Sequence, residues 1–151
     1  MESELAIEIK GVDADKIRSL RHAELRKGQN FSTTSYLRDN EESTFHLASI
    51  LDNKIVTCAT FYPEKSKKIN AVKPYRLRGM ATESNFQRRG YARELMRAAF
   101  LELKSKEADF VWCNARLLAL DFYKSLGFKL SGELFDIEGI GPHYLMQKRI
   151  T

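Results

Sequence analysis

The sequence QRRGYA at residues 87–92 decides how this chain folds, because it joins a strand pattern to a helix pattern. Residues 75–82 before it read as a strand, and residues 91–106 after it read as a helix. The apolar residues of that helix recur at the spacing of one helical face. They are Ala92, Leu95, Met96, Ala99 and Leu103. The stretch therefore predicts a strand, a tight glycine-containing turn and an amphipathic helix, in that order.

The turn has the chemistry of a phosphate-binding loop. Gly90 allows a backbone conformation and a closeness of approach that a Cβ would forbid. The helix begins directly afterwards, so its first N–H groups lack helical partners and attract anions. Arg88 and Arg89 add cations, and Ala92 is small enough for a ligand to come close. From spacing alone, an ordinary glycine at a strand-to-helix turn remains the alternative.

Length and composition indicate one globular domain over residues 1–151. Apolar residues make up 43% and charged residues 30%, which argues against general disorder. No apolar run approaches the roughly 20 residues that cross a bilayer, and the first ten residues do not resemble a signal peptide. Cys58 and Cys113 lie in apolar runs and are expected to be buried free thiols. We therefore expect a cytoplasmic protein that does not bind membranes.

The positive charge gathers in the middle of the chain. Residues 63–106 contain twelve Lys or Arg and four Glu, a net charge of +8, whereas the whole chain carries +5. This distribution favours one anionic ligand over a uniformly basic surface. A solvated basic face is the alternative. Nucleic-acid binding is disfavoured, because no basic motif interleaved with aromatic residues is present.

The remaining patterns predict an α/β domain with a mixed sheet. Asp13 is expected to cap a helix that ends near Gly28, and Asp52-Asn53 is expected to join two strands as a hairpin. A third helix is expected over 117–125. The other predicted strands are 5–10, 45–51, 54–62, 109–113, 128–135 and 144–150.

Two motifs in this order resemble the GNAT superfamily of N-acetyltransferases. LRGMATESNFQRRGYA at 77–92 is similar to the family's fourth strand and pyrophosphate loop, written [QR]-x-x-G-x-[GA]. ALDFYKSLGF at 119–128 is similar to its second signature, a helix with a tyrosine before a Gly-Phe strand entry. The resemblance covers nearly the whole chain. It implies a twisted, mostly antiparallel mixed sheet of six or seven strands flanked by about four helices.

The resemblance also implies a binding site for acetyl-CoA as cosubstrate. The pantetheine arm would contact backbone groups of Met80, Ala81 and Thr82, and an N–H near Ala81 would stabilise the oxyanion. The pyrophosphate would lie on the amides of Arg88, Arg89, Gly90, Tyr91 and Ala92. Tyr123 matches the tyrosine that protonates the departing thiolate, with a core aromatic as the alternative.

The chain departs from the family pattern at two positions. Arg116 stands where the second signature commonly has Asn, and Asn114, two residues earlier, is the substitute candidate for contacting pantetheine. Arg76 stands where some members carry a catalytic glutamate on the fourth strand. No glutamate base is therefore expected there.

His143 is the strongest candidate for a base or an acceptor-binding residue. It follows the loop Gly139-Ile140-Gly141-Pro142 and enters the last predicted strand, close to an acidic run that could attract an amine. A structural loop histidine is the alternative. The absence of HxxxH and CxxC spacings argues against a metal site.

These observations predict an acyl-CoA-dependent N-acetyltransferase that acts on a primary amine by direct attack in a ternary complex. The partners expected are acetyl-CoA and an amine acceptor, which the sequence does not identify, and a homodimer is left open. A non-catalytic acyl-CoA-binding regulator is the second interpretation, because the glutamate on the fourth strand is missing.

Overall fold

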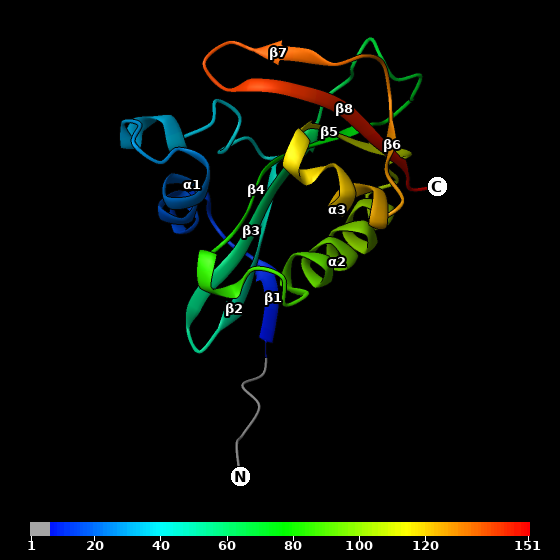
Figure 1. The fold of residues 1–151 in the computed structure, drawn as a ribbon. Coiled ribbons are helices and arrows are strands. Elements are labelled where there is room, and N and C mark those ends of the chain that lie inside the picture. The colour runs from blue at the N-terminus through cyan, green and yellow to red at the C-terminus, as the bar shows by residue number, and fades with distance from the viewer. Residues whose placement is uncertain (1–6) are drawn as a thin grey trace. The chain divides into compact units, whose positions relative to one another are not determined.

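The structure is a computed structural model that describes residues 7–151. Three α-helices and eight strands are described, joined in places by short 3-10 turns (Figure 1). The helices are α1 (Arg18–Leu25), α2 (Tyr91–Ser105) and α3 (Leu120–Ser125). The strands are β1 (Ile7–Gly11), β2 (Phe45–Leu51), β3 (Lys54–Pro63), β4 (Tyr75–Thr82), β5 (Phe110–Arg116), β6 (Lys129–Leu130), β7 (Phe135–Ile137) and β8 (Gly141–Arg149). The pairings of β1 with β2, β2 with β3, and β8 with β5, β6 and β7 are antiparallel, and that of β4 with β5 is parallel, which gives the mixed, mostly antiparallel sheet that the resemblance implies.

The central prediction, strand then loop then helix, is confirmed. β4 and α2 have nearly the predicted bounds, and the apolar face of α2 is buried at Leu95, Met96, Ala99 and Leu103. The Asp52-Asn53 hairpin is also confirmed, because both residues adopt the positive φ angles of a tight two-residue turn. Both cysteines are buried free thiols, as expected.

Three local predictions were wrong. Instead of one helix from Asp13, a 3-10 turn (Ala14–Lys16) precedes α1, and the Asp13 side chain makes no capping hydrogen bond. The expected strand over 128–135 is divided into β6 and β7, because Gly132 adopts φ +88° between them. β5 continues three residues beyond its predicted end at Cys113, where Asn114 and Arg116 interrupt the apolar run. The part of the predicted first strand before Ile7 lies outside the described residues.

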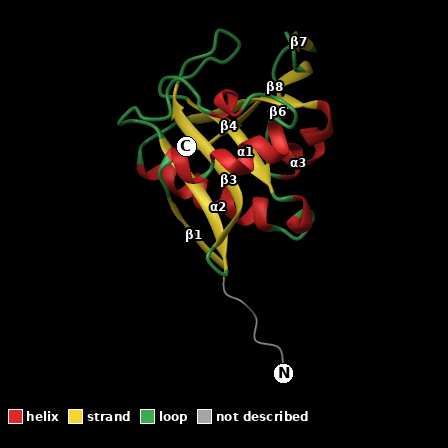
Figure 2. Ribbon diagram, turned by 90° about the vertical axis from the view of Figure 1, so that its left-hand side faces the viewer, coloured by secondary structure: helices red, strands yellow, loops and turns green. Residues whose placement is uncertain are grey.

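The chain forms two compact units. The first contains the residues up to Tyr62 together with Gly79–Ala99, and its strands are ordered β1-β2-β3-β4. Its core joins Ile17 and Leu20, at the start of the chain's helical segment, to Ala48, Cys58 and Ala81 on the strands. Figure 2 shows α1 lying against these strands.

The second unit contains Pro63–Arg78 and Phe100–Thr151. Its strands are ordered β4-β5-β8-β6, and β7 pairs with β8 as a hairpin. One face of this sheet carries Trp112, Leu145 and Phe135, which pack with Ile69 of the loop after β3. The other face carries Cys113, which contacts Tyr123 of α3. The two faces of β5 therefore have different neighbours.

A buried ion pair holds the loop after α1 in the first unit. Arg21 is 0% exposed, and its Nη1 and Nη2 donate to the Asp39 carboxylate at 2.7 and 3.0 Å. The guanidinium also donates to Thr34 O at 2.8 Å and to Thr60 Oγ1 at 2.6 Å. Its Cζ lies 3.9 Å from the centre of the Tyr36 ring. This network ties residues 34–39 to α1 and β3.

We expect the substitution Arg21→Met to reduce the free energy of unfolding by about 3–5 kcal/mol, because Asp39 would remain buried without its cation. Burial by itself would raise the pKa of Asp39, but the hydrogen bonds from Arg21 and the Tyr36 amide hold it below its usual value. Such a carboxylate stabilises the fold above about pH 4, and that stabilisation is lost as the pH falls further. Urea unfolding at several pH values measures both effects. Arg18→Met, on the same helix and partly exposed, is the control and should cost less than about 1 kcal/mol.

Candidate active site

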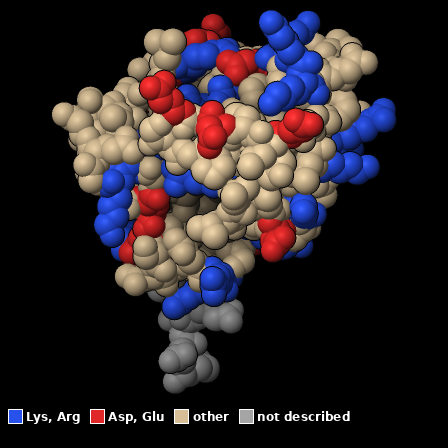
Figure 3. Space-filling model, turned by 45° about the horizontal axis from the view of Figure 1, so that its top comes forward, with Lys and Arg blue, Asp and Glu red and all other residues tan. Residues whose placement is uncertain are grey.

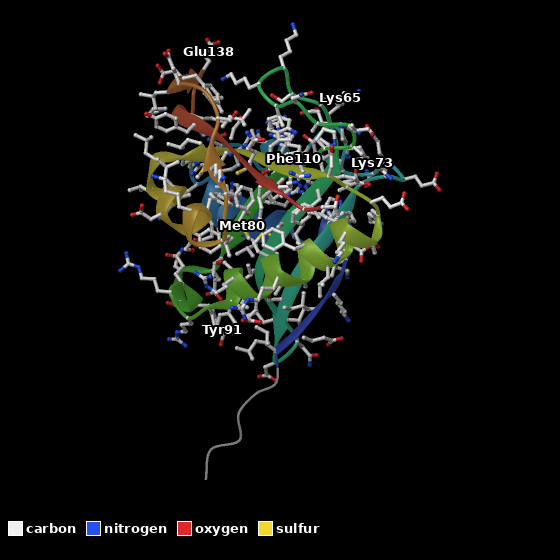
Figure 4. The ribbon with its side chains drawn as sticks, turned by 90° about the vertical axis from the view of Figure 1, so that its right-hand side faces the viewer. Lys65, Lys73, Met80, Tyr91, Phe110 and Glu138 are labelled. Atoms are coloured by element: carbon white, nitrogen blue, oxygen red, sulfur yellow. The ribbon has the colours of Figure 1, made fainter. Side chains whose placement is uncertain are left out.

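The loop at 87–92 has the backbone shape of an anion cradle. Arg88 and Gly90 adopt left-handed conformations, with φ of +62° and +87°. The first amide bonded within α2 is that of Glu94, which donates to Gly90 O at 3.0 Å, so the preceding amides point out of the helix start. A Cβ at Gly90 would meet no atom within 4 Å. The loop therefore presents polarised N–H groups to open space at the start of α2, where Figure 4 labels Tyr91.

The end of β4 lies beside this loop in the same unit. Gln87 Nε2 donates to Thr82 O at 3.1 Å, which ties the loop to the strand end. Ala81 is buried, whereas Met80 and Thr82 are partly exposed. The residue before them, Gly79, has φ +63°, and a Cβ there would lie 3.0 Å from Tyr36 Cε2. The strand thus changes direction one residue before the predicted pantetheine contacts, at a position that only glycine accommodates without displacing Tyr36.

The second unit contains the other predicted site residues, Asn114, Tyr123 and His143. Tyr123 is 6% exposed, and its hydroxyl lies beside the thiol of Cys113. Burial, followed by this thiol, raises the pKa of Tyr123 well above its usual value. Burial likewise raises the pKa of Cys113 to about 12. Tyr123 is therefore a protonated hydroxyl throughout the neutral range, which a proton donor requires.

His143 is buried, with 3% of its surface exposed. Its Nδ1 lies 2.7 Å from Gly141 O, and because a carbonyl oxygen can only accept, Nδ1 carries the proton. In the neutral ring the lone pair is then on Nε2, for which we find no partner among residues 7–151. The Phe135 ring packs against the imidazole in a tilted arrangement, with 6.2 Å between the ring centroids. This is the arrangement of a side chain that can accept a proton.

Strand register separates these candidates within the second unit. Arg116 pairs with His143 and Asn114 pairs with Leu145, so all four side chains share one face of β5 and β8. Cys113, the contact of Tyr123, points to the opposite face. The structure therefore brings Asn114 and His143 to one face, and Tyr123 to the other.

The parallel pairing of β4 with β5 is short. Its ladder contains Tyr75 with Val111 and Arg76 with Trp112, and it does not extend to Leu77 and Arg78 among the described residues. The N–H and C=O groups of Leu77 and Arg78 therefore form no hydrogen bonds in the β4–β5 ladder.

Arg76, at the position of the family's glutamate, forms an ion pair instead. Its Nη1 lies 3.0 Å from Glu64 Oε2, and its Cζ lies 5.0 Å from the centre of the Trp112 ring. Trp112 Nε1 in turn donates to Glu64 O at 2.8 Å. This position consequently carries a guanidinium held by a carboxylate from the loop after β3.

Arg116 departs from the family pattern in the sequence, and its pairing with His143 was not predicted. The apolar run ending at Cys113 concealed that β5 continues to Arg116. A polar continuation on alternate residues, Asn114 and Arg116, was the signal that could have revealed it.

No helix within residues 7–151 is long and apolar enough to cross a membrane. In the same part of the chain, no three His, Cys, Asp or Glu side chains are grouped so that they could hold a metal ion. Figure 3 shows basic and acidic side chains interspersed on the face it presents.

Comparison with known proteins gives consistent matches over almost the whole chain. The N-acetyltransferase YitI of Bacillus subtilis (strain 168), whose activity is uncharacterised, is 34% identical over 144 residues, covering 95% of this chain and 97% of YitI. A candidate N-acetyltransferase from Lactobacillus plantarum superposes with a TM-score of 0.79 at 18% identity, covering 97% of this chain and 99% of the other. An aminoglycoside 6'-N-acetyltransferase solved with coenzyme A superposes with a TM-score of 0.77 at 14% identity, covering 95% and 97%. At these identities the two solved structures show a shared fold.

The family profile decides the classification. The profile of the acetyltransferase (GNAT) family matches residues 14–128, a segment that contains both the loop at 87–92 and Tyr123. With the YitI relationship and the mixed, mostly antiparallel sheet, the chain belongs to the acetyltransferase (GNAT) family.

Proposed function

We propose that the protein transfers the acetyl group of acetyl-CoA to a primary amine by direct attack in a ternary complex. The observation that carries this proposal is the loop at 87–92, where left-handed Arg88 and Gly90 turn the chain into α2 and expose its first amides. Membership of the GNAT family and the coenzyme A in the aminoglycoside acetyltransferase structure support the same donor.

The residues of the first unit fit the donor. The amides from Arg88 to Ala92 would hold the pyrophosphate, because the space over Gly90 is open and the helix start attracts anions. Met80, Ala81 and Thr82, beside that loop, would contact the pantetheine through their main chain. Acetyl-CoA supplies a thioester, whose carbonyl accepts the attacking amine and whose sulfur departs as a thiolate.

Two side chains of the second unit would move the protons. His143 Nε2 would accept a proton from the amine, since the hydrogen bond to Gly141 O keeps its lone pair on that nitrogen. Tyr123 would give its hydroxyl proton to the departing thiolate. Asn114, on the face of His143, would contact the pantetheine arm. The products are an N-acetyl amide and the free thiol of coenzyme A, so one proton leaves the amine and one reaches the sulfur.

A non-catalytic acyl-CoA-binding regulator is the alternative, favoured by the Arg76–Glu64 pair at the position of the family's glutamate. Release of free thiol from acetyl-CoA, followed with a panel of primary amines, separates the two functions. An amine-dependent rate with formation of the N-acetyl product is the expected result. Micromolar binding of acetyl-CoA by calorimetry, with no turnover across the panel, would establish the regulator instead.

The substitution Tyr123→Phe tests the proton donor. It removes the hydroxyl and keeps the ring that packs against Phe128, 5.2 Å away between centroids. We expect kcat to fall about 10- to 100-fold, because the thiolate would then depart without a positioned acid. The Kd for acetyl-CoA should change little. Phe122→Leu, on the same helix, serves as the control, and an unchanged kcat in Tyr123→Phe would assign Tyr123 to the core alone.

A further inference from the structure

The three residues expected to contact pantetheine form a short part of β4 that is fixed at both ends within the first unit. We call them the donor segment: Met80, Ala81 and Thr82. Gly79, directly before the donor segment, has φ +63° and changes the direction of the strand. Glu83, directly after it, donates its amide hydrogen to Val56 O of β3 at 2.8 Å. The conformation of the donor segment therefore depends on what holds these two ends.

Two side chains from outside β4 lie directly over Gly79. A Cβ added at Gly79 would be 3.0 Å from Tyr36 Cε2 and 3.2 Å from Tyr36 Oη. It would also be 3.3 Å from Arg21 Nε. All three distances are shorter than an ordinary Cβ contact of 3.4–4 Å. Tyr36 and Arg21 thus occupy the space in which any larger residue would place its side chain.

Neither of these side chains is free to move aside. Arg21 is fully buried and is bound to the Asp39 carboxylate, as described above. Tyr36 is 6% exposed, its ring lies 3.9 Å from Arg21 Cζ, and its amide donates to Asp39 Oδ2 at 2.9 Å. A densely packed interior transmits a displacement instead of absorbing it. A methyl group at Gly79 would therefore displace β4 in preference to Tyr36 or Arg21.

Helix α1 reaches the other end of the donor segment as well. The hydroxyl of Ser84, the residue after Glu83, lies 2.6 and 3.1 Å from the two carboxylate oxygens of Glu24. Glu24 follows Arg21 by three positions, so both side chains leave α1 on one side. Figure 2 shows α1 lying against the strands of the first unit. This helix consequently contacts the chain immediately before and shortly after the donor segment.

We propose that Tyr36 and Arg21 are positioning residues for the acyl donor, which fix the turn at Gly79 and so orient the N–H groups of the donor segment toward the thioester. This inference rests on the proposed acetyltransferase function. In this role the two side chains act through Gly79 and not by contact with acetyl-CoA. The stabilisation of an oxyanion depends steeply on the placement of its donors. A shift of β4 should therefore reduce kcat more than it weakens binding of acetyl-CoA.

A size exchange between Gly79 and Tyr36 tests this proposal in the full-length protein. Gly79→Ala places a methyl group against Tyr36, and we expect kcat to fall about 10-fold, because small misplacements of reacting groups slow catalysis strongly. The Kd for acetyl-CoA, measured by calorimetry, should rise less than about threefold. Tyr36→Leu removes both Tyr36 atoms that the methyl group would meet. In the Tyr36→Leu background, Gly79→Ala should therefore lower kcat by no more than about twofold, which a double-mutant cycle reveals.

Gly28→Ala is the matched control. Gly28 also has a left-handed conformation, with φ +79°, but no atom lies within 4 Å of a Cβ there. Its substitution should leave kcat and the Kd for acetyl-CoA unchanged. An equal loss of kcat from Gly79→Ala in both backgrounds would assign the effect to backbone strain, and an unchanged kcat would show that the turn does not matter. Either result would overturn the positioning role and leave the acetyltransferase function intact. Binding of acetyl-CoA by the unmodified protein without acetylation of any amine would refute the proposed function itself.

Discussion

Substitution of Gly90 by valine is expected to abolish binding of acetyl-CoA while leaving the protein folded. Gly90 has φ +87°, a conformation that a β-branched residue adopts only at a cost of about 1–2 kcal/mol. The loop would relax to a negative φ, and the amides at the start of α2 would no longer converge on one point. We expect the Kd for acetyl-CoA, measured by calorimetry, to rise at least about 100-fold, since a pyrophosphate makes several charge-assisted hydrogen bonds.

Gly28→Val is the matched control for Gly90→Val. Gly28 has φ +79° and, like Gly90, no atom within 4 Å of a Cβ, so the backbone strain is similar. Gly28 follows α1 and is distant in sequence from the loop at 87–92. Both variants should lose a similar, small amount of thermal stability, and only Gly90→Val should lose affinity. Parallel losses of melting temperature and affinity in Gly90→Val would mean that this glycine is structural.

The substitution His143→Gln is expected to reduce kcat by about 100- to 10,000-fold at neutral pH, the range attributed to a positioned general base. Glutamine can still donate to Gly141 O, but it has no basic lone pair to accept a proton from the amine. The Kd for acetyl-CoA should remain unchanged. Because an alkylamine loses its own proton near pH 10, the deficit of the variant should shrink as the pH rises toward that value.

His22→Gln provides the control for His143→Gln. His22 lies on α1, and its Nε2 contacts Gln29 O at 2.8 Å, outside the unit that contains His143. Its substitution should leave kcat and its pH dependence unaltered. If His143→Gln lowers the melting temperature but not kcat, the histidine only stabilises the start of β8.

The fold could be predicted from the sequence where a pattern of residue types continued over several positions. The periodic apolar positions of α2 and the Asp52-Asn53 turn each determine their structure through short-range geometry, and both were confirmed. The prediction failed where the local signal was a single residue. Asp13 has the residue type of a helix cap but no capping bond, because the chain makes a 3-10 turn before α1 begins.

For the candidate site, the donor side is the part that could be predicted from the sequence alone. The loop at 87–92 is local, since a glycine, a helix start and two arginines act within six residues, so one motif could identify it. The family relationship followed from that motif and from the one around Tyr123.

Only the tertiary structure decided which side chains meet on the second unit. Arg116 and His143 are separated by 27 positions in the chain, and it is the register of β5 with β8 that places them side by side. The register of β7 with β8 likewise turns Asp136 away from His143, although the two are close in sequence. Register depends on long-range pairing, and a slip of one residue would move every one of these side chains to the other face. Which side chains surround His143 therefore follows from the fold.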